Sequence, residues 1–250
     1  MRVARLALLA AALAVPLVAA PADDRFREAN ELARAGDYPK AIALYGELAA
    51  SGEESASLYW NWAQAATARG AQGEALWALL RARELDPGDR AVVRDVEGLR
   101  ESLNLDPAEI APEPLTAAGR VSRRFRLALL ALVLLALSLV AHGLARAGPG
   151  LRWPGGAAWA SLLLGLLAAA VPLAASFARP TAVVVRRGAP LLDAASPTAE
   201  ATGSLREGEV VPVLEASGVW LRVEDNAGAR GWAHVDDARR LDVAPAPSGD

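Results

Sequence analysis

Cysteine is absent from this 250-residue sequence, and histidine occurs only at His142 and His234. The lack of cysteine excludes disulfide bonds, thiolate metal sites and a cysteine nucleophile. Two histidines are too few for a multi-histidine metal site or a histidine relay. The only lysine is Lys40, so Ser/Lys catalysis would depend on that one residue. We therefore expect a protein that is not an enzyme, with no catalytic residues, no metal and no other cofactor.

Acidic residues are missing from residues 115–189, which carry nine arginines. Residues 23–114 have a net charge of −8 and residues 190–250 one of −6, so the overall charge of −3 hides a basic block between two acidic parts. The long apolar runs lie in the basic block. This order predicts a membrane region between two water-exposed modules, and it argues against nucleic-acid binding because the arginines do not gather on a water-exposed module.

The first apolar run indicates a signal peptide over residues 1–22. Arg2 and Arg5 precede an apolar stretch that ends in Ala20-Pro21-Ala22, a small-residue pattern typical of a cleavage site. An uncleaved anchor is the alternative. Cleavage after Ala22 would export the chain that follows.

Two further apolar runs predict transmembrane helices over residues 125–145 and 157–178. The loop between them, residues 146–156, is rich in glycine and proline and too short for a domain, so the two helices would form a hairpin in contact with membrane lipids. A signal peptide places both flanking modules in the periplasm. The positive-inside rule disagrees, because more arginines flank the hairpin than lie in its loop. We follow the signal peptide, since large domains translocate regardless of charge, and expect the bacterial inner membrane.

A 34-residue repeat lies within residues 23–104. The equivalent pairs are Ala29 and Ala63, Leu32 and Ala66, Gly36 and Gly70, Ala41 and Ala75, and Tyr45 and Leu79. This period and spacing resemble the tetratricopeptide repeat, a helix–turn–helix unit in which Gly36 and Gly70 would end the first helix. A further helix over residues 89–104 is expected to cover the open end of the two repeats. Residues 105–124, rich in proline and alanine, are expected to form a linker.

Tetratricopeptide arrays present a concave groove to peptides, and we expect this one to bind protein partners. The residues predicted to line the groove are Phe26, Asn30, Trp60, Gln64 and Thr67. Trp62 and Trp77 are expected in the core.

A clamp for a peptide carboxylate is an alternative for this groove. Asn30 and Asn61 resemble the two asparagines with which some repeat domains hold a C-terminal carboxylate. The basic residues of that clamp are not matched, because Phe26, Ala91 and Asp95 occupy their positions. This mismatch favours a general protein-binding groove.

Residues 179–243 predict a small all-β barrel, followed by a flexible tail at 244–250. Short β-rich runs at 181–187, 209–214, 219–223 and 230–235 are separated by turn residues. Trp220 and the Gly231-Trp232 pair resemble the bacterial SH3-like domain. Some such domains bind peptidoglycan, so we assign Trp220 and Trp232 to an SH3-like recognition surface, with packing as the alternative. Binding of proline-rich peptides is disfavoured because these tryptophans are the only aromatic residues of the module.

The fold class is thus a multidomain membrane protein with an all-α tetratricopeptide array, a two-helix transmembrane hairpin and a small all-β SH3-like barrel. This order of modules resembles the tetratricopeptide-repeat member of the Bat (Bacteroides aerotolerance) family. The resemblance implies an envelope complex linked to aerotolerance or stress, with von Willebrand A-domain membrane proteins and a MoxR-type ATPase as partners. We expect a non-catalytic, membrane-anchored protein–protein interaction scaffold. The alternative is a peptidoglycan-binding envelope protein that acts through the SH3-like domain.

Overall fold

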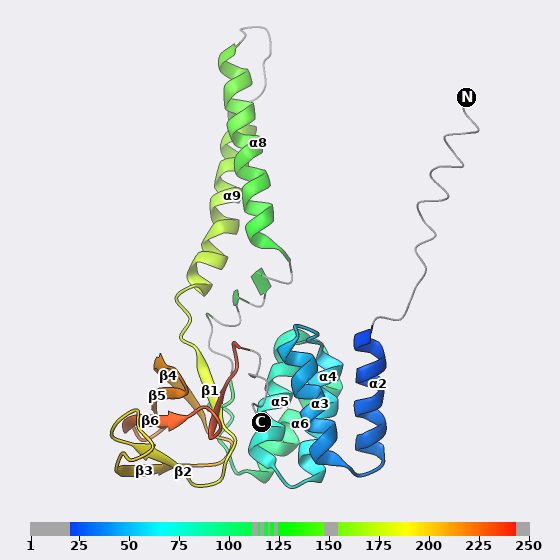
Figure 1. The fold of residues 1–250 in the computed structure, drawn as a ribbon. Coiled ribbons are helices and arrows are strands. Elements are labelled where there is room, and N and C mark those ends of the chain that lie inside the picture. The colour runs from blue at the N-terminus through cyan, green and yellow to red at the C-terminus, as the bar shows by residue number, and fades with distance from the viewer. Residues whose placement is uncertain are drawn as a thin grey trace, which may run out of the picture.

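The computed structural model describes residues 21–111, 115, 118–119, 121–122, 125–147 and 155–243 (Figure 1). In this part of the chain, a helical array and a β-domain lie side by side, and a two-helix hairpin rises from their junction. The predicted tail at 244–250 and the predicted signal peptide, apart from Pro21 and Ala22 at the start of the first described helix, lie outside the described residues.

The helical array follows the chain order, each helix packing on the next. Its members are α2 (Pro21–Arg34), α3 (Tyr38–Ala50), α4 (Ala56–Ala68), α5 (Gln72–Leu85) and α6 (Arg90–Ser102). Side chains that accept a hydrogen bond from the first turn define two of the helix starts. Ser55 Oγ accepts from the Leu58 amide at 3.1 Å, and Asp89 Oδ1 accepts from the Ala91 amide at 2.7 Å.

The 34-residue period recurs in the backbone itself. Gly36, Gly70 and Asn104 each follow the first helix of a pair, with φ of +83°, +83° and +54°. Each of the three amides donates to the carbonyl three residues earlier, as expected for a helix that ends in the left-handed region. The predicted helix ends at Gly36 and Gly70 are confirmed. Helix α6, predicted only to cover the open end, also ends at the same point of the 34-residue period as α2 and α4.

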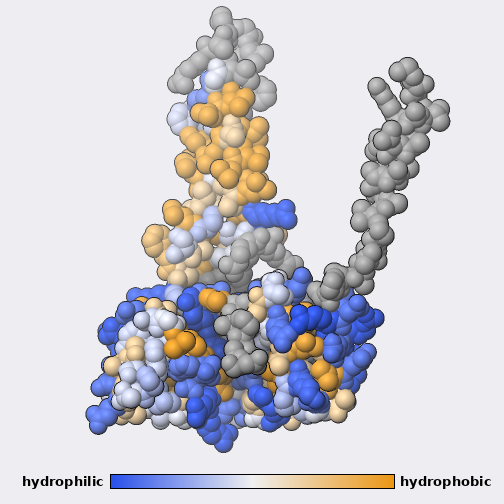
Figure 2. All heavy atoms as spheres, viewed as in Figure 1, coloured by the Kyte–Doolittle hydropathy of each residue, from blue (hydrophilic) through white to orange (hydrophobic). Residues whose placement is uncertain are grey.

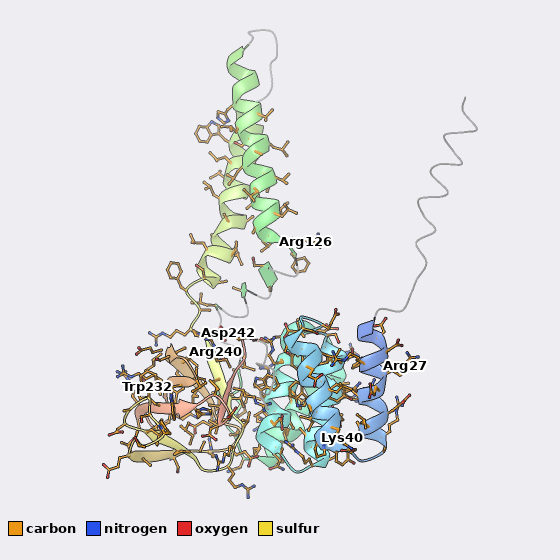
Figure 3. All side chains as sticks on the ribbon, in the orientation of Figure 1. Arg27, Lys40, Arg126, Trp232, Arg240 and Asp242 are labelled. Atoms are coloured by element: carbon orange, nitrogen blue, oxygen red, sulfur yellow. The ribbon has the colours of Figure 1, made fainter. Side chains whose placement is uncertain are left out.

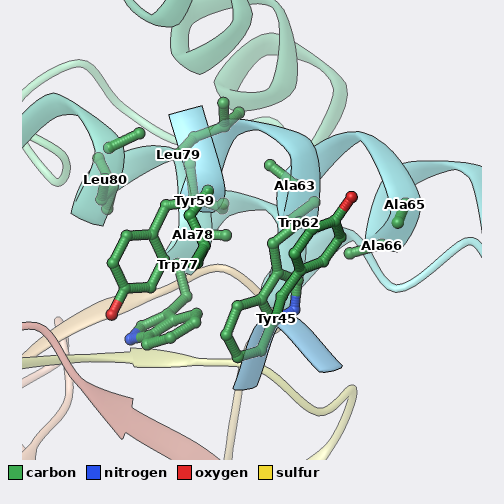
Figure 4. Packing of buried hydrophobic residues seen from close by; sticks show 14 of the residues in the cluster. Tyr45, Tyr59, Trp62, Ala63, Ala65, Ala66, Trp77, Ala78, Leu79 and Leu80 are labelled. Carbon is green, nitrogen blue, oxygen red and sulfur yellow. The ribbon is translucent and has the colours of Figure 1, made fainter. Parts of the chain in front are cut away.

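The core of the array is built from aromatic side chains packed against alanine (Figure 4). Trp62 and Trp77 are 2% and 0% exposed, which confirms that they belong to the core. Their ring centroids lie 5.1 Å apart in an edge-to-face arrangement, and the Tyr59 ring contacts both. The small residues shared by the repeats, including Ala29 and Ala63, are buried and let the helices approach closely.

Residues 105–111, predicted as the start of a linker, are instead a packed strap. Leu105 and Ile110 are 2% and 6% exposed and join the core of the array. The Ile110 carbonyl accepts a hydrogen bond from Arg83 Nη2 at 2.8 Å, and the Leu105 carbonyl accepts one from Arg100 Nη1 at 2.6 Å. The linker prediction was wrong here because composition alone does not show that these two apolar side chains find a surface to cover.

The hairpin consists of α8 (Leu127–Ala147) and α9 (Gly155–Ala175), which pack against each other. Ala131, Ser138 and Gly165 are buried. A Cβ on Gly165 would approach Leu135 Cγ to 3.0 Å, so the two helices are in close contact at this glycine. Figure 2 shows hydrophobic residues gathered along the hairpin above a largely hydrophilic body. Taken over the described residues, no helix combines the length and the apolar character that a membrane crossing needs, so the predicted transmembrane spans find no support here.

The β-domain is one antiparallel sheet whose strand order is β3-β2-β6-β5-β4-β1-β7. The strands are β1 (Thr181–Val184), β2 (Ala189–Leu192), β3 (Ala201–Leu205), β4 (Val210–Ser217), β5 (Trp220–Glu224), β6 (Arg230–His234) and β7 (Ala238–Arg240). The four predicted runs all form strands. Strands β2, β3 and β7 were not predicted, since a proline, a glycine and two arginines interrupt their apolar pattern.

Strand β1 joins the two modules because both of its faces are buried. Ala182 and Val184 point into the core of the β-domain, whereas Val183 joins the core of the helical array together with Leu241. Helix α5 lies against β1, and its residues 73–82 are all buried. The helical array and the β-domain therefore share a continuous core.

Candidate functional site

A pocket of about 340 Å³ opens between α2, α3 and α4. Its lining residues are Asn30, Ala33, Arg34, Tyr38, Tyr45, Asn61, Gln64, Ala65 and Ala68. The first helices of the repeat units, α2 and α4, contribute most of these residues because the 34-residue period places equivalent positions side by side. We call this site the groove pocket.

Asn30 organises the floor of the groove pocket. Its Oδ1 accepts a hydrogen bond from the Tyr45 hydroxyl at 2.7 Å and another from Asn61 Nδ2 at 2.9 Å. Burial raises the pKa of Tyr45 to about 12, against a smaller opposing effect of Arg34, so the phenol stays neutral and remains a donor at neutral pH. These contacts fix the side-chain amide of Asn30 in one orientation.

A second polar group ties α4 to α6 beside the groove pocket. Asp95 Oδ2 accepts hydrogen bonds from Trp60 Nε1 at 2.8 Å and from Gln64 Nε2 at 2.9 Å. Asp95 therefore positions Trp60 and Gln64, and it places a negative charge next to the pocket.

The structure brings together some of the predicted groove residues. Asn30 and Gln64 line the groove pocket. Phe26 is half-buried with its ring centroid 6.2 Å from that of Tyr45, and Trp60 is half-buried beside Asp95. Thr67 is exposed on α4 and does not line the pocket.

The lining residues that sequence reasoning missed include Arg34, Tyr38 and Tyr45. Tyr45 carried a signal, since its repeat equivalent, Leu79, is an apolar residue that could not bind Asn30. Asn30 and Asn61 do meet, as the carboxylate-clamp alternative requires. The structure supplies no cation at the clamp's other positions.

A second surface lies on the outer face of β5 and β6. Trp220 pairs with His234, and Arg222 pairs with Trp232, so these side chains share one face of the sheet. Both tryptophans and His234 are half-buried, and the Trp220 and His234 rings meet edge to face with centroids 5.1 Å apart. Figure 3 shows Trp232 on the side of the β-domain away from the helical array. The predicted SH3-like residues are thus partly accessible.

Glu74 anchors the interface between α5 and the β-domain. This side chain is 4% exposed and binds Trp62, Arg69 and Arg239, the last through Arg239 Nη1 at 2.8 Å. The Arg239 guanidinium also lies 5.4 Å from the Trp77 ring centroid, a cation–π distance. Arg239 thus joins the β-domain to α5 both through an ion pair with Glu74 and through contact with the Trp77 ring.

Three further α5 residues bind the β-domain. The Gly73 amide donates to Glu207 Oε1 at 2.9 Å, and Trp77 Nε1 donates to the Arg240 carbonyl at 2.9 Å. Arg81 donates to the Leu241 carbonyl and forms an ion pair with Glu54. Burial raises the pKa of Tyr59, which donates to the same Glu54 carboxylate.

The strap adds a second bridge between the modules. Glu109 Oε2 accepts from Arg206 Nη2 at 2.7 Å and from Asn226 Nδ2 at 2.9 Å. Across the described residues, no group of three or more His, Asp or Glu side chains is placed to hold a metal ion.

The comparisons with known proteins concern the β-domain. Residues 185–237 match the family model of the bacterial SH3 domain, which confirms the prediction of an SH3-like module. The match contains Trp220 and the Gly231-Trp232 pair. No curated protein and no solved structure matches the chain.

Proposed function

We propose that this protein is a non-catalytic, membrane-anchored scaffold of an envelope complex. The proposal starts from a bacterial SH3 domain that packs against a helical array containing the groove pocket. In this proposal the groove pocket holds a segment of a partner protein, and the outer face of β5 and β6 contacts a second component. The observation that carries the proposal is the shared core around α5, which holds two separate accessible surfaces on one body.

A peptide-sized ligand suits the groove pocket. A volume of about 340 Å³ accommodates one or two side chains, and the lining offers amide, phenol and guanidinium groups. The hydrogen bonds at Asn30 and Asp95 hold the amide and phenol groups before any ligand arrives. A preorganised site loses less conformational entropy on binding, which favours recognition.

Membrane anchoring is proposed from the exposed side chains of the hairpin. On α8, Leu132 and Leu139 are 65% and 77% exposed, and on α9, Leu163 and Leu167 are 65% and 69% exposed. Burying one leucine side chain is worth about 1.5–3 kcal/mol, so these residues require an apolar environment. Both helices carry such residues over their outer sides, which suits acyl chains surrounding the hairpin better than one protein surface. We place the protein at the bacterial inner membrane with both modules in the periplasm.

The resemblance to the Bat family refines this proposal. It would make the helical array a tetratricopeptide domain and would make von Willebrand A-domain membrane proteins and a MoxR-type ATPase complex the partners, in a role linked to aerotolerance or stress. A reporter enzyme fused after Asp250 tests the topology. Periplasmic reporter activity is expected, and activity confined to the cytoplasm would overturn the proposed orientation.

Filling the groove pocket tests partner binding. Ala68 is exposed, lines the pocket and makes no side-chain hydrogen bond, so Ala68→Trp should block the pocket without removing a contact. Thr67→Trp adds the same bulk one residue away, outside the pocket lining, and is the matched control. Partners co-purified with the intact protein in mild detergent should be lost from Ala68→Trp and kept by Thr67→Trp. Equal recovery from both variants would refute the groove.

Peptidoglycan binding through the β-domain is the second candidate. It is favoured by the half-buried tryptophans of the outer face together with the bacterial SH3 match. Because the β-domain shares its core with α5, the test uses the full chain and purified sacculi. Sedimentation with sacculi that is abolished by Trp232→Ala, while Ala68→Trp has no effect, would favour this candidate over the scaffold.

A further inference from the structure

We infer that the groove pocket takes a carboxylate of the partner and that Arg34 determines this specificity. The inference rests on the proposed partner-binding function of the groove. It concerns a residue outside the positions at which a carboxylate clamp places its cations, which Phe26, Ala91 and Asp95 occupy here.

The lining of the groove pocket has one sign of charge. It contains the guanidinium of Arg34 and no aspartate or glutamate. Of the acidic side chains close in sequence, Asp37 forms an ion pair with Lys40 at 2.6 Å. Within the described part of the chain, Arg34 has no ion-pair or hydrogen-bond partner for its side chain. An anion entering the pocket would therefore meet an uncompensated cation.

The neutral groups beside Arg34 are arranged to donate. Asn30 Oδ1 already accepts two hydrogen bonds, so the amide end of Asn30 that is left for a ligand is the Nδ2 donor. Among the described residues, this nitrogen has no acceptor. A carboxylate could accept from Asn30 and from Arg34 together, and hydrogen bonds between charged groups are about twice as strong as neutral ones.

A carboxylate matches the pocket better than a phosphate. One guanidinium balances a single negative charge, whereas a phosphate carries about −1.5 to −2 at neutral pH and would need a second cation. Asp95 lies across Gln64 from the pocket and would repel a carboxylate that shifted toward α6. Attraction by Arg34 and repulsion by Asp95 thus fix where along the groove the acidic group binds.

A peptide array tests this inference on the intact protein in mild detergent. The probe is a positional-scanning set of octapeptides tethered by the N-terminus, printed once with a free C-terminal carboxylate and once amidated. We expect one of two preferences from the wild-type protein. Either peptides with Asp or Glu at one position retain about five- to tenfold more protein than peptides with Asn or Gln there, or peptides with a free C-terminus retain that much more than amidated ones. The two printings distinguish a side-chain carboxylate from a chain end.

The matched variants are Arg34→Gln and Arg27→Gln. Arg27 lies on the same helix and pairs with Asp24 away from the pocket, where Figure 3 shows it on the outer side of α2. Arg34→Gln should reduce the acid preference to about one while neutral peptides are still retained, and Arg27→Gln should keep the preference. Peptide retention without acid preference, or a preference that survives Arg34→Gln, would overturn this inference alone. Retention of no peptide by the wild type would overturn the groove as well.

Discussion

Gly73 offers the sharpest test of the joint between α5 and the β-domain. A Cβ at this position would lie 2.6 Å from the Val184 carbonyl oxygen and 2.9 Å from Val185 Cα, both of them backbone atoms. Ordinary contact needs roughly 3.5 Å, so Gly73→Ala would push α5 and β1 apart by several tenths of an ångström. Gly98 on α6 has nothing within 4 Å of its Cβ position and provides the matched glycine.

The two substitutions should change the free energy of unfolding in opposite directions. Alanine is favoured over glycine inside a helix by about 1 kcal/mol, so Gly98→Ala should stabilise the protein by up to that amount. Gly73 lies in the first turn of α5, where any such gain is smaller and is outweighed by overpacking of about 1–3 kcal/mol. Separation would also weaken the hydrogen bond from the Gly73 amide to the Glu207 carboxylate, a class of bond worth about 1.5–3 kcal/mol. We expect a net loss of about 1–3 kcal/mol.

The assay is urea unfolding of the full chain in mild detergent, followed by circular dichroism. The midpoint should fall for Gly73→Ala and rise for Gly98→Ala. Hydrogen exchange at the β1 amides should increase only for Gly73→Ala, since that change acts at the joint. A Gly73→Ala protein as stable as the wild type, with unchanged β1 exchange, would refute the shared core.

Two other substitutions probe buried polar groups. Arg81→Met removes the ion pair with Glu54 and the hydrogen bond to the Leu241 carbonyl. The free energy of unfolding in urea should fall by about 3 kcal/mol or more, and hydrogen exchange at the Leu241 amide should become faster. A loss below about 1 kcal/mol would contradict this role of Arg81. Tyr45 has its pKa raised to about 12, whereas an unfolded tyrosine titrates near pH 10, so the unfolded chain loses this proton first. The free energy of unfolding should therefore be unaffected by this group below about pH 10 and should fall as the pH rises toward 12. Tyr45→Phe should flatten that fall, and an identical pH profile would show that the phenol is not buried in this way.

The sequence predicted the elements better than it predicted their contacts. The repeat spacing located the helix ends at Gly36 and Gly70, and the β-branched run at 181–187 located β1. These features are local, because a positive φ or an apolar alternation is written in a few adjacent residues. The docking of α5 on β1 depends on residues more than a hundred positions apart, for which no local pattern exists.

Part of that docking was nevertheless visible as asymmetry between the repeats. The α5 residues that bind the β-domain are Gly73, Glu74, Trp77 and Arg81, and their equivalents in α3 are Pro39, Lys40, Ala43 and Glu47. At none of these four positions do the two repeats carry the same residue, although they share the alanines that pack the helices together. Arg34 was missed for a different reason. The resemblance to a carboxylate clamp predicts cations at the positions of Phe26, Ala91 and Asp95, and Arg34 is not one of these positions.

The buried α5 has a consequence for how this protein can change over evolution. Solenoid proteins lengthen by copying a unit, because each new copy offers its neighbours the same surface. Here the unit that contains α5 carries side chains matched to strands more than a hundred residues away, so a copy inserted after it would separate those side chains from their strands. Growth is therefore open on the α2 side of that unit, where an added copy would lengthen the groove and leave the contacts between α5 and the SH3 domain in place.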